Sequence, residues 1–178
     1  MRQKQDMVRA AAGMILYRYP EAGYIEILTG LRPSSGSIIA VFGDFVEPND
    51  SVPMDAATRA AKKWTGNELN FQIKYPYPVA SSGPEIEYKD IIAGIETIYS
   101  VSFPPVAITI FAGMITSGYP MCISADIWQF FFLSPTALKK AVLARGHAQI
   151  IDQFLALHYM PPVFGNPRIR NAIFSTRD

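Results

Sequence analysis

The sequence has little that would mark it as a secreted, nucleic-acid-binding or membrane protein. It contains one cysteine, Cys122, in 178 residues, which excludes an internal disulfide and a zinc site built from cysteines. Its formal net charge is only +1, so the chain has no bulk attraction for nucleic acid or for an anionic membrane. This cysteine content is compatible with a reducing compartment, the cytoplasm or an organelle matrix. The neighbours of Cys122 are largely apolar, and we expect its thiol to be buried.

Long apolar runs and several familiar motifs are also missing. The longest apolar run, residues 106–115, is interrupted by threonine and glycine and is too short to span a bilayer. Residues 1–9 are basic but lack the apolar run of a secretory signal. The sequence contains no Gly-x-Ser-x-Gly nucleophile motif, no phosphate-binding loop and no dinucleotide-binding glycine fingerprint. A serine-hydrolase triad, a P-loop enzyme and a Rossmann dehydrogenase therefore have little support.

The apolar content of 49% is enough for one core of ordinary size. We expect a single domain over residues 1–178, with an irregular tail from residue 160 that is rich in proline and basic residues. Ser134 and Pro135 predict the start of a helix over residues 136–145, and residues 147–159 carry a helical apolar stripe. Residues 88–100 fit either a short helix or a strand. Apolar, β-prone segments predict strands over residues 9–18, 24–31, 37–42, 71–77, 107–115 and 127–133.

The most informative stretch runs from Gly43 to Gly66. It follows the apolar residues 37–42, and its segment Glu47-Pro-Asn-Asp50 is dense in turn residues and acids, which is typical of a loop. An alanine-rich helix is predicted over residues 55–65, with Pro53 in the first turn and Gly66 as the C-terminal stop. Asp50, Ser51 or Asp55 is expected to cap this helix. The predicted order is therefore strand, acidic loop, short helix and glycine stop.

This order resembles the box of the Nudix hydrolase family. Gly43 matches the first of the family's paired glycines, Asp44 stands at the second, and Arg59 and Gly66 match the arginine and the closing glycine of the box. The resemblance implies an α/β fold, an α/β/α sandwich with a mixed sheet. It also implies Mg²⁺- or Mn²⁺-dependent hydrolysis of a nucleoside diphosphate linked to another moiety.

The chain departs from the family at the residues that bind the metal. The three helix glutamates of the family fall on Ala60, Lys63 and Trp64. Hard divalent cations need clustered oxygen ligands, whereas alanine offers no ligand and lysine repels the ion. We therefore expect a degenerate box, with weak or no hydrolysis. On this reading the protein binds a nucleotide-diphosphate-like ligand or a protein partner.

Basic residues of the predicted helix are the candidate ligand-binding groups. Arg59, Lys62 and Lys63 stand at i, i+3 and i+4 and are expected to share one face. Together with Gly43, they are candidates to hold an anionic diphosphate without metal. The alternative is that the lysines form a solvated helix face.

The second reading of the same stretch is an active hydrolase with a displaced metal site. In that case Glu47 and Asp50 are the catalytic candidates, and Glu47, Asp50 and Asp55 are the candidate ligands for Mg²⁺ or Mn²⁺. The resemblance also makes Glu85 and Glu87 candidates for a general base in a loop after the box. The alternative for the loop acids is ordinary turn and capping chemistry.

Aromatic and histidine residues complete the candidates. Phe130, Phe131 and Phe132 cannot all face one side of a strand, because successive side chains alternate. Burial on both faces of a sheet explains them; otherwise they form an apolar surface for a second copy of the chain or another partner. The further members of that surface would be Phe103, Tyr119, Met121 and Trp128. His147 and His158 are expected to be helix-surface or core residues.

Overall fold

The computed structural model describes residues 9–20, 24–74, 78–82, 90–92, 95–97, 106–123, 125–144 and 146–158. Glu85, Glu87, Phe103 and the tail from residue 160 lie outside these ranges. The helices are α1 (Pro53–Thr65), α2 (Pro135–Leu138) and α3 (His147–His158). The main sheet contains β1 (Arg9–Arg18), β2 (Glu26–Arg32), β3 (Ser37–Ile39), β4 (Phe42–Phe45), β5 (Asn70–Ile73), β6 (Ala80–Ser82), β9 (Val106–Ser117) and β10 (Gln129–Leu133). A separate hairpin pairs β7 (Asp90–Ile92) with β8 (Ile95–Thr97).

The main sheet is mixed, as the resemblance to the Nudix family implied. Its strands follow the order β10-β2-β1-β9-β5, while β3 pairs with β2, β4 with β1 and β6 with β9. The central strands β1 and β9 are parallel, from Arg9 opposite Val106 to Tyr17 opposite Met114. The other strand pairs of the described sheet are antiparallel. The two longest strands therefore form the centre of the sheet, and the short strands β3 and β4 lead from it into the box.

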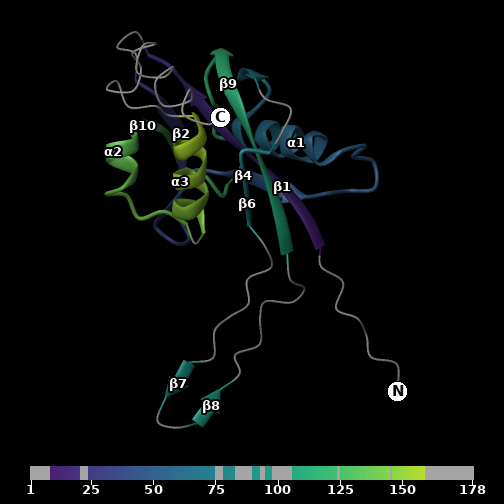
Figure 1. Ribbon diagram of the computed structural model, residues 1–178. Coiled ribbons are helices and arrows are strands. Elements are labelled where there is room, and N and C mark those ends of the chain that lie inside the picture. The colour runs from purple at the N-terminus through teal and green to yellow at the C-terminus, as the bar shows by residue number, and fades with distance from the viewer. Residues whose placement is uncertain are drawn as a thin grey trace, which may run out of the picture.

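Helices cover both faces of this sheet (Figure 1). Met14 and Leu16 of β1 pack in a cluster with the alanines of α1, whereas Ile15 and Tyr17 pack in a second cluster with Phe154 of α3. The alternation follows from the pleat, which sends successive side chains to opposite faces. The predicted α/β/α sandwich is thus confirmed. The small side chains Ala56, Ala57, Ala60 and Ala61 are fully buried and let α1 lie close to the sheet.

Close backbone approach fixes β4 against β1 at the start of the box. Gly13 lies opposite Gly43, and Ala12 lies opposite Asp44. A Cβ on Gly13 would lie 2.7 Å from a methyl of Val41, closer than side-chain carbons normally pack. The glycine therefore leaves room for the side chain of Val41, the residue directly before β4.

Three sequence expectations are corrected by the structure. The helix expected over residues 136–145 ends at Leu138, because the chain beyond it hydrogen-bonds to Ile38: the N–H of Ile38 donates to Val142 O and the N–H of Ala144 donates to Ile38 O. The strand expected over residues 37–42 is divided into β3 and β4 by a break at residues 40–41. The thiol of Cys122 is exposed rather than buried.

The exposure of Cys122 follows from where its loop lies. The backbone N–H of Met121 donates to Thr65 O at the end of α1, so residues 121–123 cross the surface there. Met121 and Ile123, the apolar neighbours that suggested burial, are themselves exposed. Among the described residues no helix is long and apolar enough to cross a membrane.

Candidate functional site

The acidic loop and the first turn of α1 are fixed by local hydrogen bonds. Val52 has an extended backbone before the helix, and Pro53 occupies the first turn as predicted. The carboxylate of Asp55 accepts the backbone N–H groups of Ser51 and Val52, at 3.0 and 3.1 Å. A carboxylate at this place satisfies free donors and is favoured by the helix dipole. Asp55 thus caps the helix, one of the two roles that the sequence left open.

Arg59 joins the loop to the helix through three carboxylates. Its guanidinium lies 2.8 Å from Asp50, 3.1 Å from Glu47 and 3.5 Å from Asp44. It also donates to the carbonyl of Phe45 at 2.9 Å. This leaves little of the guanidinium for a ligand, since its donors already have partners. Arg59 therefore holds the loop against the helix.

Asp50 is the best-covered carboxylate of this network, with 8% of its side chain exposed. One carboxylate oxygen accepts both the guanidinium of Arg59, at 2.8 Å, and the backbone N–H of Glu47, at 2.7 Å. The hydrogen bond from Arg59, followed by that from Glu47, holds the pKa of Asp50 below its usual value. In turn, the hydrogen bond to Asp50 raises the pKa of Arg59. Both groups are charged across the ordinary pH range.

Lys63, which the sequence alignment sets at a metal-binding glutamate of the family, supplies a second internal cation. Its Nζ lies 2.7 Å from a carboxylate oxygen of Asp44, and the other oxygen accepts the N–H of Phe45 at 2.9 Å. Partial burial raises the pKa of Asp44, but the hydrogen bonds from Lys63 and Phe45 and the charges of Lys63 and Arg59 outweigh it, so the pKa is lowered. The Lys63 side chain is 62% exposed, and its ammonium still has free donors.

Trp64 and Ala60 are the residues that the sequence alignment sets at the remaining two glutamate positions. The indole N–H of Trp64 donates to Gly43 O at 3.2 Å, and the guanidinium of Arg32 lies 5.9 Å from the centre of its ring. Ala60 of α1 is fully buried. Gly43, a predicted ligand-binding residue, therefore offers its carbonyl to Trp64, a contact that the sequence did not predict.

These residues do not fit a hard divalent cation. Mg²⁺ and Mn²⁺ require several oxygen ligands, but Ala60, Lys63 and Trp64 supply none. The loop carboxylates are already neutralised by Arg59 and Lys63. Within the described part of the chain, no three His, Cys, Asp or Glu side chains are grouped to hold a metal ion. The arrangement can instead bind anions through the free donors of its lysines.

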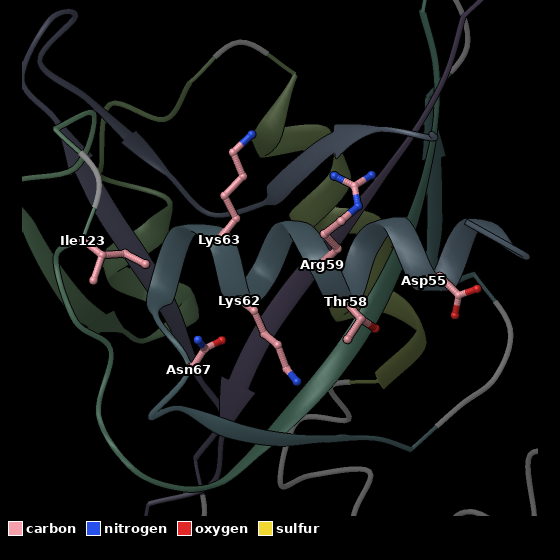
Figure 2. Close-up of a pocket in the computed structure, with 7 residues that line it drawn as sticks. All are labelled: Asp55, Thr58, Arg59, Lys62, Lys63, Asn67 and Ile123. Carbon is pink, nitrogen blue, oxygen red and sulfur yellow. The ribbon is translucent and has the colours of Figure 1, made fainter. Parts of the chain in front are cut away.

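An open groove of about 590 Å³ runs along the outer face of α1. Its lining residues are Asp55, Thr58, Arg59, Lys62, Lys63, Asn67 and Ile123. Arg59 and Lys63 point to one side of the helix and Lys62 points away from them (Figure 2), because neighbouring residues are about 100° apart around a helix. Lys62 forms no ion pair with another described residue. The basic face expected from the sequence is thus divided between a paired side and a free lysine.

His147 fixes the break between β3 and β4, just before Gly43. Its Nδ1 accepts the backbone N–H of Ala40 at 3.1 Å, so the neutral ring is the form that the fold uses. Burial, and the nearby positive charge of Arg32, lower the pKa of His147 to about 4. From the sequence alone this histidine was expected to be a helix-surface or core residue, because Ala40 and His147 are distant in the chain.

Sequence reasoning also overlooked Arg32. This residue ends β2 and follows no recognisable motif, so only the tertiary structure brings it next to Trp64. Asp44 was visible as a departure from the family glycine, but its partner Lys63 was not.

No protein-family model and no curated protein matches the sequence at a significant level. Solved structures do match. An Ap4A hydrolase of C. elegans, solved as a binary complex, superposes with a TM-score of 0.59 at 15% identity, covering 84% of this chain and 97% of the other. The Nudix domain of Shewanella oneidensis NrtR, complexed with ADP ribose, gives 0.57 at 13% identity and covers 83% and 86%. A MutT/Nudix family protein from Enterococcus faecalis gives 0.60 at 17% identity and covers 93% and 69%. The chain therefore has the Nudix fold.

Proposed function

We propose that this protein binds an anionic, nucleotide-diphosphate-like ligand at the box helix without a divalent cation, and that it has weak or no hydrolytic activity. The observation that carries the proposal is the 2.7 Å contact between Lys63 Nζ and Asp44. The alignment of the box sets this ammonium where the family carries a metal-binding glutamate, which supports binding without a divalent cation. With Arg59, it neutralises the loop carboxylates that a displaced metal site would need.

The free donors on the outer face of α1 support an anionic ligand. Lys62 is unpaired among the described residues, and Lys63 keeps donors that Asp44 does not use. Thr58 and Asn67 add polar groups to the same groove. A diphosphate presents several charged oxygens and would replace the water around these lysines. Because the NrtR domain of the same fold was solved with ADP ribose, ADP ribose is the natural first probe.

Each residue of the site has a distinct task in this proposal. Arg59 holds the loop acids and keeps the loop against the helix, so it is a positioning residue. Lys62 and Lys63 contact the ligand, and Gly43 anchors Trp64 through its carbonyl. The family's Mg²⁺ or Mn²⁺ would supply Lewis-acid chemistry, but this donor set does not suit it, and no reaction step is assigned.

Isothermal titration calorimetry of ADP ribose and inorganic pyrophosphate into the full chain, in EDTA, tests the proposal. We expect binding without metal, and weaker binding by about fivefold in Lys63→Gln and Lys62→Gln, the loss typical of an exposed charge contact. Lys140→Gln is the control, because Lys140 is exposed on the turn after α2. Binding that requires Mg²⁺, with phosphate release that Glu47→Gln abolishes, would instead establish the hydrolase reading with Glu47, Asp50 and Asp55 as its acids.

A protein-interaction module is the second candidate, and exposed apolar side chains favour it. Tyr119 is 80% exposed and Trp128 is 71% exposed, with Met121 and Ile123 also open to solvent. Such side chains on a surface loop are typical of contact sites. Sedimentation velocity of the wild type and Trp128→Ser tests self-association. A concentration-dependent dimer that the substitution removes would support this candidate, and a monomer at all concentrations would count against a homo-oligomer.

A further inference from the structure

We infer that a small-molecule site separate from the box lies between α2 and α3, and that its ligand is a free amino acid with an apolar side chain. A cavity of about 280 Å³ is lined by these two helices and the segment that joins them (Figure 1). Its volume is at the small end of the range for pockets that hold small molecules. The inference goes beyond the proposed function and does not depend on it.

The walls of the cavity are fixed by the fold. Leu138 and Ile151, which line it, are buried in the core cluster on the face of the sheet opposite to α1. Residues 141–144 are held to Ile38 of β3 by two backbone hydrogen bonds, of 2.8 and 2.9 Å. Leu143 of this segment lines the cavity and packs against the same cluster. The cavity therefore has apolar walls that belong to the core.

Two side chains of opposite charge line this otherwise apolar cavity, Lys139 and Asp152. Lys139 directly follows α2, and Asp152 lies within α3. Asp152 stands four residues after Ala148 and three before Leu155, which also line the cavity, so the three share one face of α3. Apart from the histidines at its two ends, Asp152 is the only ionisable residue of α3. The single carboxylate of this helix thus lies on the face that borders the cavity.

Both charges are available to a ligand. Lys139 and Asp152 form no ion pair with each other or with another residue that the structure describes. The cations of the box differ in this respect, because Arg59 and Lys63 are held by loop carboxylates. A small molecule that fills a cavity of this size reaches both charged side chains, since both line it.

The chemistry of the lining selects the ligand class. The apolar walls favour an apolar group, Lys139 favours a carboxylate and Asp152 favours an ammonium. A free amino acid with an apolar side chain carries all three groups. A fatty acid would place its carboxylate beside Asp152, and an aliphatic amine would place its ammonium beside Lys139. Each of them therefore meets a like charge that the amino acid neutralises.

Titration of leucine into the ¹⁵N-labelled full chain, followed by two-dimensional NMR, tests the inference. We expect saturable shifts of the amides of α2, residues 139–144 and α3, with little change in α1. Lys139→Gln and Asp152→Asn should each weaken binding by about fivefold, the loss typical of an exposed charge contact. Lys140→Gln and Glu68→Gln are the controls, because both residues are exposed and neither lines the cavity. The melting temperature of each variant confirms that it is folded.

Matched ligands separate the three parts of the recognition. N-acetyl-leucine lacks the ammonium and leucinamide lacks the carboxylate, so each should bind at least about fivefold more weakly than leucine. Alanine keeps both charges but buries less apolar surface, and it should also bind more weakly.

Three outcomes would overturn the inference. The first is the absence of saturable shifts with leucine, and the second is a response confined to α1. The third is equal binding of leucine, N-acetyl-leucine and leucinamide, because the cavity would then be an apolar contact site, as for a side chain of a protein partner. The proposed function is tested by ADP ribose and pyrophosphate at α1, so either proposal can fail while the other stands.

Discussion

Acid should destabilise this protein through His147. The ring accepts the N–H of Ala40 through Nδ1 and is partly buried at the start of α3, which lowers its pKa from 6.5 to about 4. The unfolded chain therefore takes up a proton on this histidine in a pH range where the folded protein does not. Its contribution to stability is complete above pH 6.5 and is lost as the pH falls towards about 4.

The size of the effect follows from the two pKa values. A shift of one pKa unit corresponds to about 1.4 kcal/mol, so the full contribution of His147 is about 3 kcal/mol, with the folded pKa at about 4. Between about pH 7.5 and about pH 4.5 the free energy of unfolding should fall by about 2.5 kcal/mol from this residue alone. That is a large part of the stability of an ordinary domain.

Urea unfolding followed by the fluorescence of Trp64 and Trp128 measures this effect. The matched variant is His147→Asn, whose amide oxygen can accept the same backbone N–H but does not titrate. Carboxylates with lowered pKa values, such as Asp44 and Asp50, also contribute less stability at acidic pH. This loss is the same in both proteins and cancels in the comparison. The variant should therefore lose less stability than the wild type over this pH range. Equal losses in the two proteins, or an NMR midpoint of His147 near 6.5, would refute the reasoning.

Three further predictions concern the box. Arg59→Gln should lower the melting temperature by about 2–4 °C, since it leaves three loop carboxylates without their shared cation, whereas Lys140→Gln should change it little. Asp55→Ala should lower the free energy of unfolding in urea by about 1 kcal/mol through loss of the helix cap, with the exposed Asp152→Ala on α3 as the control. Mn²⁺ or EDTA should leave the wild-type melting temperature unchanged, because the site offers no cluster of oxygen ligands. Lys63→Glu restores one carboxylate and removes the ammonium, and Mn²⁺ should raise the melting temperature of that variant. An Mn²⁺-stabilised wild type, or a variant that ignores Mn²⁺, would contradict this last prediction.

The internal cations change what the box can do. In the family that the sequence resembles, a divalent ion joins the helix carboxylates to the substrate. Here Arg59 and Lys63 hold the loop acids from within the chain. The loop is thereby fixed before any ligand arrives. A ligand that approaches Lys63 must share its ammonium with Asp44, so the strength of binding depends on how strongly its oxygens compete for the remaining donors.

The residues that align with the glutamates of the box could be read from the sequence because helix spacing is local. Gly43, Arg59 and Gly66 set the alignment, and Ala60, Lys63 and Trp64 then fall on the glutamate positions. The position of Pro53 in the first turn and the order of strand, loop and helix also follow from residues close together in the chain. The consequence of the substitutions is not local. Lys63 meets Asp44 across nineteen positions of the sequence, and that contact depends on how β4 lies beside the helix.

The sequence by itself determined the span of β1 and the acidic loop followed by an alanine-rich helix, because periodicity, turn residues and capping act over a few residues. The mixed α/β/α architecture was implied by the resemblance to the Nudix family. Tertiary structure decided the short α2, the exposure of Cys122 and the separation of Lys62 from Lys63. It also brought Ala40 to His147 and Arg32 to Trp64. These features depend on backbone and side-chain partners that are distant in the chain, and burial and hydrogen bonding with such partners override local preference. The charge balance of the site belongs to this second group, since it is set by which loop carboxylate each cation of the helix reaches.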